Sequence, residues 1–332
     1  MATVGGTLQL ISELAYSVIS KVDPSVPSYT SRIDRVLMDH RNAYKDDGGR
    51  EKVAIVTGAD SGVGFVTANA LARAGYQTIL ACQDQELAQE ALDHLKRQTG
   101  LDNLEVMQLD LASLASVKRF VEQFVAKYKA LDVLVNNDCV AMCPYSQTKD
   151  RIEMQFGTSH IGHFALTTQL LDSLMAAEGG ARVVNVSSIA SVFATNIDYS
   201  AIEDKAKYSP TGNYAIAKLA NITFSNALAR RLEGTNVTVN SLHPGSTAPN
   251  ISPTILSNAI SGPIARAVIV DAHHGAFTPI YLALSPGAAE VTGKHFSRGQ
   301  AVNPHPKALD KGEQERLWAY SEQLVAEKLK TL

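Results

Sequence analysis

Short apolar runs alternate along the chain with longer stretches in which apolar residues recur every three or four positions. The first run, residues 53–56, is rich in β-branched residues and has no polar interruption, which is typical of a strand buried on both faces. A helical pattern follows it as far as Gly75, and the alternation then repeats. We expect strands at residues 53–56, 77–81, 104–109, 133–136, 182–186 and 237–242, and helices at residues 65–75, 87–98, 114–127, 152–175 and 214–232.

This order of elements predicts the fold class. Strands that alternate with helices form right-handed βαβ units, and these build a parallel sheet with helices on both faces. We therefore expect an α/β fold with a Rossmann-like, doubly wound sheet in a single domain over residues 51–332. Residues 1–50 are expected to form an N-terminal extension, in which an amphipathic helix over 8–22 is followed by a polar, turn-rich linker over 23–51. The apolar stripe of that helix suits docking on the domain itself, on a membrane surface or on a partner.

The composition of the chain excludes several classes of function. The 332 residues carry 30 Lys and Arg against 33 Asp and Glu, and this formal charge of −3 excludes the basic field that binds nucleic acid. Three cysteines without a Cys-x-x-Cys pair indicate neither a disulfide framework nor a zinc site, so we expect no metal and a reducing compartment. No apolar run reaches the roughly 18 residues of a membrane span, and the N-terminus lacks the basic start of a secretory signal. We expect a cytoplasmic protein, with residues 8–22 as a route to peripheral contact with an intracellular membrane; the oligomeric state stays open.

A glycine-rich turn lies between the first strand and the first helix. Glycines permit a tight turn and a close approach of the backbone to a pyrophosphate, and the amides that open the following helix favour a bound anion. A glycine cluster alone is weak evidence, but this position at a strand-to-helix junction indicates a dinucleotide site. The residues expected to contact the dinucleotide are Gly58, Asp60, Ser61, Gly62, Val63 and Gly64.

Five further motifs follow the glycine turn in order. Tyr214 and Lys218 lie four residues apart on an expected helix, and Ser188 follows an expected strand. With the spacing Gly-x-x-x-Gly-x-Gly they resemble the short-chain dehydrogenase/reductase family, and the surrounding sequence is similar to its retinol-dehydrogenase-like and WW-domain-containing-oxidoreductase-like branch. The resemblance covers residues 50–330. The remaining motifs are Asp110-Leu111, Asn136-Asn137 and His243-Pro244-Gly245.

The resemblance implies hydride transfer between NADP or NAD and a small or lipophilic alcohol or carbonyl. It assigns Tyr214 as the acid/base, Lys218 as its tuner and a ligand of the nicotinamide ribose, and Ser188 as the partner of the carbonyl oxygen. A phenol has a pKa of about 10, too high for a base near neutrality, and an ammonium group on the same helix face favours the phenolate. The implied cofactor contacts outside the glycine turn are Gln83, Asp110, Leu111, Asn137, Tyr214, Lys218, Pro244 and Gly245.

Four positions depart from the family pattern. Ser159 stands where the family often has an asparagine that links the lysine to water, and Asp138 and Cys139 replace two small residues beside the cofactor. Gln83 stands where related sequences carry an arginine that pairs with a 2′-phosphate, so the choice between NAD and NADP is left open. These departures motivate an alternative function, a catalytically weakened nucleotide-binding or interaction protein of the same fold.

Two apolar stretches are candidates for the wall of a substrate pocket. One lies between Ser188 and Tyr214, and the other covers residues 251–270. An apolar wall favours a lipophilic substrate such as a retinoid, a steroid or an aliphatic aldehyde, whereas a helix packed on the core is the alternative for the second stretch. The apolar residues of the first stretch are Phe193, Ile197, Tyr199, Ile202 and Tyr208.

The segment His160-Ile161-Gly162-His163 matches a short signature of one class of aminoacyl-tRNA synthetases. Its mid-chain position on an expected helix, and the lack of the second signature of that class, argue against this function. The sequence assigns the segment no role.

Overall fold

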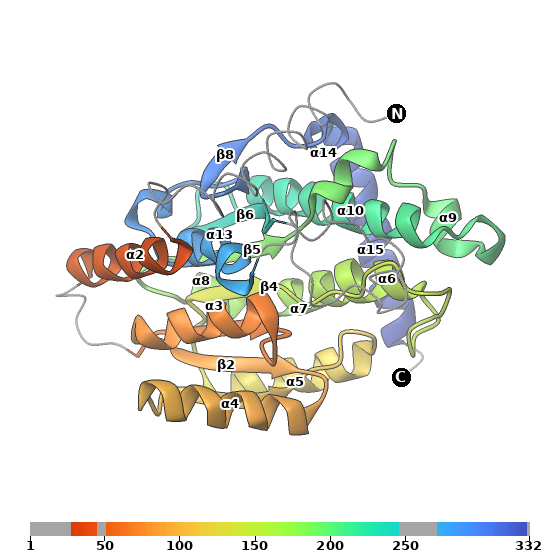
Figure 1. Ribbon diagram of the computed structural model, residues 1–332. Helices are drawn as coiled ribbons and strands as arrows, with labels where there is room; N and C mark the ends of the chain where they lie inside the picture. Colours follow the sequence, from red (N-terminus) through yellow and green to blue (C-terminus); the bar gives the residue numbers. More distant parts are fainter. Residues whose placement is uncertain (1–27, 45–50, 246–270, 331–332) are drawn as a thin grey trace, which may run out of the picture.

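The computed structural model describes residues 28–44, 51–245 and 271–330. Within these ranges eight strands form one sheet in the order β3-β2-β1-β4-β5-β6-β7-β8 (Figure 1). Neighbouring strands from β3 to β7 run parallel, and β8 pairs antiparallel with β7 at the edge. The strands are β1 (Val53–Thr57), β2 (Gln77–Cys82), β3 (Leu104–Gln108), β4 (Val133–Asn136), β5 (Ala181–Val186), β6 (Val237–His243), β7 (His295–Ser297) and β8 (Gln300–Val302).

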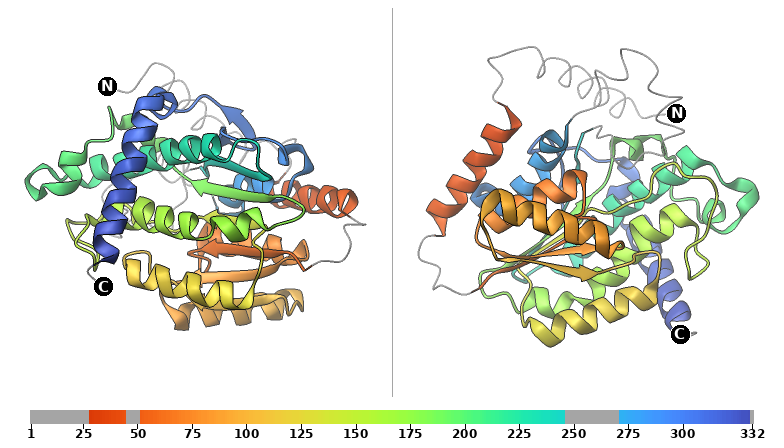
Figure 2. Two further views of the ribbon diagram at one scale, coloured as in Figure 1. Left: turned by 180° about the vertical axis from the view of Figure 1, so that it is seen from behind. Right: turned by 60° about the horizontal axis from the view of Figure 1, so that its bottom comes forward.

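Helices cover both faces of the sheet, as the two further views show (Figure 2). One face carries α3 (Gly62–Arg73), α4 (Gln85–Thr99) and α13 (Ala272–Leu284). The other carries α5 (Leu114–Lys127), α7 (His163–Gln169) and α10 (Pro210–Arg231), with α15 (Lys311–Leu329) packed outside them. The shorter helices are α6 (Met154–Phe156), α8 (Leu171–Met175), α9 (Tyr199–Glu203) and α14 (Pro306–Leu309), with 3₁₀ turns at Ile189–Phe193, Lys205–Lys207 and Pro286–Ala288.

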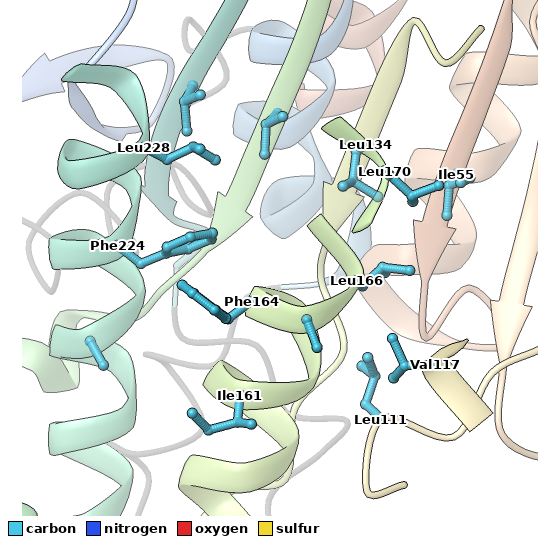
Figure 3. Close-up of a cluster of buried hydrophobic side chains, with 14 of the residues drawn as sticks. Ile55, Leu111, Val117, Leu134, Ile161, Phe164, Leu166, Leu170, Phe224 and Leu228 are labelled. Carbon is cyan, nitrogen blue, oxygen red and sulfur yellow. The ribbon is translucent and has the colours of Figure 1, made fainter. Parts of the chain in front are cut away.

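The core beneath α7 and α10 joins these helices to the middle of the sheet (Figure 3). Phe164 of α7 faces Phe224 of α10, and their ring centroids are 5.3 Å apart. Ile55 of β1 and Leu134 of β4 lie in the same buried cluster. Their burial fixes where α7 lies relative to the carboxyl ends of β1 and β4.

The predicted doubly wound sheet is confirmed, and all six expected strands are present within one residue at each end. The strand order reverses between β1 and β4, the switch point at which doubly wound sheets bind their ligands. The expected helix over 152–175 is interrupted, because a π-helical turn at Gly157–Gly162 separates α6 from α7. Such turns are frequent at functional sites.

The linker interpretation of residues 23–51 is wrong for part of that range. Residues Tyr29–Ala43 form helix α2, whose first turn is capped by the Ser28 side chain, which accepts a hydrogen bond from the Ser31 amide. Tyr29 stacks on His274 of α13 at 3.8 Å between ring centroids, and the His40 Nδ1 lies 2.9 Å from the Leu284 carbonyl oxygen. Helix α2 therefore belongs to the folded domain, whereas the expected helix over 8–22 and the apolar stretch 251–270 lie outside the described residues.

Candidate active site

The predicted catalytic side chains meet where β5, β6 and α10 come together. Ser188 directly follows β5, and the N-terminal part of α10 carries Tyr214 and Lys218. The Ile189 amide donates to Nδ1 of His243 at 3.1 Å, which ties the segment after β5 to the end of β6. The structure thus brings the three residues together beside the Pro244-Gly245 turn.

Lys218 is almost fully enclosed, with 1% of its surface exposed. Its Nζ donates to the Val186 carbonyl oxygen at 3.3 Å and lies 5.6 Å from the centroid of the Tyr214 ring. Burial alone lowers the pKa of Lys218, but the neighbouring thiol of Cys139, the phenol of Tyr214 and the carboxyl group of Asp138 outweigh it and raise the pKa. The ammonium group therefore stays charged beside the phenol.

The pKa of Tyr214 is raised above its ordinary value. Burial is the main cause, while the charge of Lys218 and a hydrogen bond with Ser188 act in the opposite direction. Lys218 thus favours the phenolate as expected, but burial outweighs its effect. At neutral pH this phenol holds its proton and can donate it to a carbonyl oxygen.

The glycine turn has the shape that a pyrophosphate requires. Gly58 and Gly62 adopt positive φ angles of 61° and 55°, which favour glycine. A Cβ on Gly64 would lie 2.1 Å from the Gly58 carbonyl oxygen, so only glycine lets α3 approach the turn. The N-cap Ser61 makes no side-chain hydrogen bond to α3, unlike Asp84 and Ser113 at α4 and α5, which leaves the first amides of α3 available to an anion. These residues fit a dinucleotide.

The expected adenine contacts Asp110 and Leu111 follow β3. Asp110 accepts from the Ala112 amide at 2.9 Å and pairs with Lys149 at 2.8 Å, an exposed lysine that belongs to no motif of the sequence. A Cβ on Gly162 would lie 2.6 Å from the Leu111 carbonyl oxygen, so the π-helical turn packs directly against this loop.

Asp138 lies against the glycine turn. Its Cβ is 2.9 Å from the place that a Cβ on Gly58 would occupy, and its carboxyl oxygen is 3.0 Å from it. Burial, reinforced by the neighbouring Asp60 carboxylate, raises the pKa of Asp138 to about 6. This carboxyl group therefore resists ionisation at the place where a pyrophosphate would bring further negative charge.

Two other positions that depart from the family pattern are Gln83 and Ser159. Gln83 is exposed at the end of β2, and the adjacent Asp84 caps α4 by accepting from the Glu86 and Leu87 amides. The Ser159 hydroxyl is buried in the π-helical turn and has no hydrogen-bond partner there. Among the described residues, no group of three or more His, Cys, Asp and Glu side chains could hold a metal.

One predicted substrate wall is largely wrong. Ile197 and Ile202 are buried in the main core, and Tyr199 packs on Tyr320 of α15 at 4.5 Å between ring centroids. Tyr199 therefore faces the C-terminal helix, and Ile197 and Ile202 are part of the core. Phe193 differs, because it is 55% exposed after Ser188.

Two residues at the switch point of the sheet were not predicted from the sequence. Thr57, the last residue of β1, and His163, the first of α7, are hydrogen bonded to each other. The His-Ile-Gly-His segment did point to His163, but it was compared only with the signature of another enzyme class and was assigned no role. Gln155 also binds the 137–153 loop, since its side chain accepts from the Met142 amide and donates to Tyr208.

A profile described as short chain dehydrogenase matches residues 52–259, more than half of the chain. The chain belongs to the short-chain dehydrogenase family. Retinol dehydrogenase 14 from Mus musculus is 39% identical over 304 residues, which cover 86% of this dehydrogenase and 90% of that relative. The family resemblance stated from the motifs is confirmed.

Solved structures agree with this assignment. An uncharacterised protein from Mycobacterium Paratuberculosis is 34% identical with a TM-score of 0.66, over 83% of this dehydrogenase and 93% of that chain. The Pseudomonas aeruginosa RhlG/NADP active-site complex is 25% identical with a TM-score of 0.57, over 74% and 93% of the two chains. This dehydrogenase is an NAD(P)-dependent oxidoreductase that acts on CH–OH groups. The matches give no support to the non-catalytic alternative.

Within the described part of the dehydrogenase, no helix combines the length and the apolar character needed to cross a bilayer.

Proposed function

We propose that this dehydrogenase interconverts a lipophilic alcohol and its carbonyl, with a retinoid as the first candidate substrate. The observation that carries the catalytic assignment is the enclosed Lys218, whose Nζ lies beside the Tyr214 ring while the phenol hydrogen bonds with Ser188. The substrate class rests on the relatives, because mouse and human proteins at 39% identity are named retinol dehydrogenase 14.

Each catalytic residue has one task in carbonyl reduction. The reduced nicotinamide supplies a hydride to the carbonyl carbon. Tyr214 transfers its proton to the carbonyl oxygen, and the Lys218 charge stabilises the phenolate that remains. Ser188 donates a hydrogen bond to the same oxygen as negative charge develops on it. Alcohol oxidation runs these steps in reverse.

A bound nucleotide would lie across the switch point between β1 and β4. The opening amides of α3, from Gly62 and Val63, would hold the pyrophosphate together with the turn at Gly58, Asp60, Ser61 and Gly64. The other contacts are Asp110 and Leu111 at the adenine, Asn137 at the loop after β4, Tyr214 and Lys218 at the ribose, Pro244 and Gly245 at the nicotinamide, and Gln83 beside the adenosine ribose. NADP and NAD are both retained as cofactors.

Residues 8–22 are the candidate membrane contact. The apolar stripe of this segment and a lipophilic substrate both favour a peripheral position on an intracellular membrane. Flotation of the full chain with phosphatidylcholine–phosphatidylserine vesicles tests it. Ile11→Asp with Val18→Asp should move the protein from the vesicle fraction to the unbound fraction, and equal flotation of both proteins would remove the idea.

The test of the enzyme assignment measures binding and turnover in one preparation. NADPH and NADH are titrated by cofactor fluorescence, and turnover is followed with all-trans-retinal, a medium-chain aldehyde and a ketosteroid. Retinal reduction that Tyr214→Phe abolishes without loss of cofactor binding supports the proposal. Absence of binding at millimolar cofactor, or equal turnover in Tyr214→Phe, would overturn the catalytic assignment, whereas turnover of the aldehyde alone would overturn the retinoid assignment.

A further inference from the structure

His163 connects α7 to the end of β1. The side chain is buried, its Nε2 lies 2.9 Å from the Thr57 hydroxyl, and its Nδ1 lies 3.0 Å from the Ser159 carbonyl oxygen. None of the roles assigned above uses this histidine. Its contacts reach from Ser159 in the π-helical turn to Thr57, the residue before the glycine turn.

The partners fix the direction of both hydrogen bonds. A carbonyl oxygen only accepts, so Nδ1 carries the proton and donates to Ser159. Burial lowers the pKa of His163 to about 4, so the ring is neutral near pH 7 and its Nε2 accepts. The Thr57 hydroxyl must therefore donate its proton to His163.

The two lone pairs of the Thr57 hydroxyl accept hydrogen bonds from the loop that follows β4, the strand beside β1. The Thr57 Oγ1 accepts from the Asn137 amide at 2.9 Å and from the Asp138 amide at 3.0 Å. A hydroxyl has one proton and two lone pairs, so these three contacts satisfy it completely. The competing acceptor for its proton, the Val135 carbonyl oxygen, is more distant at 3.5 Å. His163 thus orients the hydroxyl so that both lone pairs meet the loop after β4.

The loop held in this way borders the proposed cofactor site. The Asn137 side chain donates to the carbonyl oxygens of Thr57 and Gly58, at 2.9 and 3.3 Å. The next residue, Asp138, contacts Gly58. A change in the direction of the Thr57 hydroxyl would release the loop from the glycine turn on which the pyrophosphate would rest.

His160 from the same segment serves as a comparison within the molecule. It is equally buried, but its Nε2 lies 2.8 Å from the Ser321 hydroxyl of α15, on the side away from β1. Figure 3 shows α7 between Phe224 of α10 and Leu111, with Ile161 and Phe164 packed toward α10. The two histidines of the segment therefore join α7 to different neighbours, and one of these neighbours borders the cleft.

We propose that His163 is a positioning residue for dinucleotide binding, which acts through Thr57 to hold the Asn137–Asp138 loop against the glycine turn. The inference rests on the proposed placement of the nucleotide. It gives the His-Ile-Gly-His segment a function of its own in this dehydrogenase.

The test compares His163→Gln with His163→Met. Glutamine places a strong acceptor where Nε2 lies, whereas methionine has a similar length and only a weak acceptor in its sulfur. His163→Met should raise the Kd for NADH about tenfold, the effect of one lost hydrogen bond, and leave kcat at saturating NADH within about twofold. His163→Gln should recover most of the affinity. His160→Met, the matched control, should lower the melting temperature without changing the Kd.

A second pair of variants keeps the test decisive if His163→Met does not fold. Thr57→Val should raise the Kd to the same extent as His163→Met, and Thr57→Ser should not. If Thr57→Val or His163→Met binds NADH like the wild type while its melting temperature falls, the histidine is merely structural and the proposal is wrong. Failure of the wild-type protein to bind NADH would instead contradict the proposed function.

Discussion

Two sides of the candidate active site differ in how their charges are balanced. On the proton-transfer side, formed by Ser188, Tyr214 and Lys218, the buried ammonium group has negative or polarisable neighbours that keep it charged. On the nucleotide side, formed by the glycine turn and residues 137–139, the Asp138 carboxyl group faces a second carboxylate, Asp60, and resists ionisation. Of the four departures, Asp138 therefore opposes the binding of a negatively charged cofactor, whereas the groups that handle the proton are in place.

The largest expected effect is on the proton-transfer side. Tyr214→Phe removes the proton donor and should lower kcat about 10²- to 10⁴-fold, the usual contribution of general acid–base catalysis. The Kd for NADPH should stay within about twofold, because the substitution removes only one of the proposed cofactor contacts and leaves Lys218 and the glycine turn in place. Single-turnover reduction of retinal with fluorescence titration measures both quantities. A large loss of cofactor affinity would show that the two sides are not separable.

A smaller effect of opposite sign is expected on the nucleotide side. Asp138→Ala removes a carboxyl group beside the pyrophosphate position and should lower the Kd for NADH and NADPH about five- to tenfold, or about 1 kcal/mol after screening. The Thr57 contacts are to the backbone and survive the change. Asp84→Asn is the matched control, because it keeps a helix cap away from the turn and should leave the Kd unchanged. Weaker binding by Asp138→Ala would mean that the carboxyl group is a ligand rather than an obstacle.

The pH dependence of cofactor affinity separates charge from shape. The pKa of Asp138 is raised to about 6, so the group is largely neutral at about pH 5 and ionised at about pH 7.5. Wild-type affinity for NADH should fall about threefold to fivefold across this range, and Asp138→Asn should show no such fall. NADH is the suitable probe because the phosphate of NADPH itself titrates near pH 6.

Ionisation of Asp138 should also lower the folding stability of the protein as the pH rises. The neutral form of Asp138 is favoured in the folded protein. Its contribution to the free energy of unfolding is therefore fully present below the pKa of an aspartate in the unfolded chain, and it is lost as the pH rises through about 6. The melting temperature of Asp138→Asn should therefore exceed that of the wild type at about pH 7.5 more than at about pH 4. An equal difference at both pH values would show that the carboxyl group ionises normally.

The smallest expected effect concerns cofactor choice. Gln83→Arg places a cation at an exposed position at the end of β2 and should improve NADPH binding relative to NADH by about threefold, as expected of a solvent-exposed ion pair. Gln83→Met controls for side-chain length. The ratio of the two Kd values at low and high salt measures the effect, and a ratio unaltered in Gln83→Arg would place the 2′-phosphate elsewhere.

The elements that have a clear local sequence pattern could be predicted from the sequence alone. Buried parallel strands such as β1 and β4 are continuous apolar runs, and Tyr214 and Lys218 share a helix face whatever the packing around them. Helix α2 was not predicted from the sequence, because it is mostly polar. Its few buried side chains, among them Ile33 and Leu37, form a core face only when α13 is present. Local composition therefore resembled a linker.

The remaining features depend on contacts that a sequence does not display. Ile197 and Ile202 were apolar enough for a substrate wall, but they belong to a buried core whose other members come from distant parts of the chain, among them Leu317 of α15. The raised pKa of Tyr214 follows from burial, which spacing alone does not reveal. The contact of His163 with Thr57 joins residues 106 positions apart.

The double variant Asp138→Ala/Tyr214→Phe tests most directly the claim that the two sides govern different quantities. Cofactor Kd and single-turnover rate are measured for it beside both single variants. We expect a Kd close to that of Asp138→Ala and a rate close to that of Tyr214→Phe, because Asp138 is the smallest of the named influences on Lys218 and nearly independent sites contribute additively. A Kd that returns to the wild-type value, or a rate that Asp138→Ala restores, would contradict it.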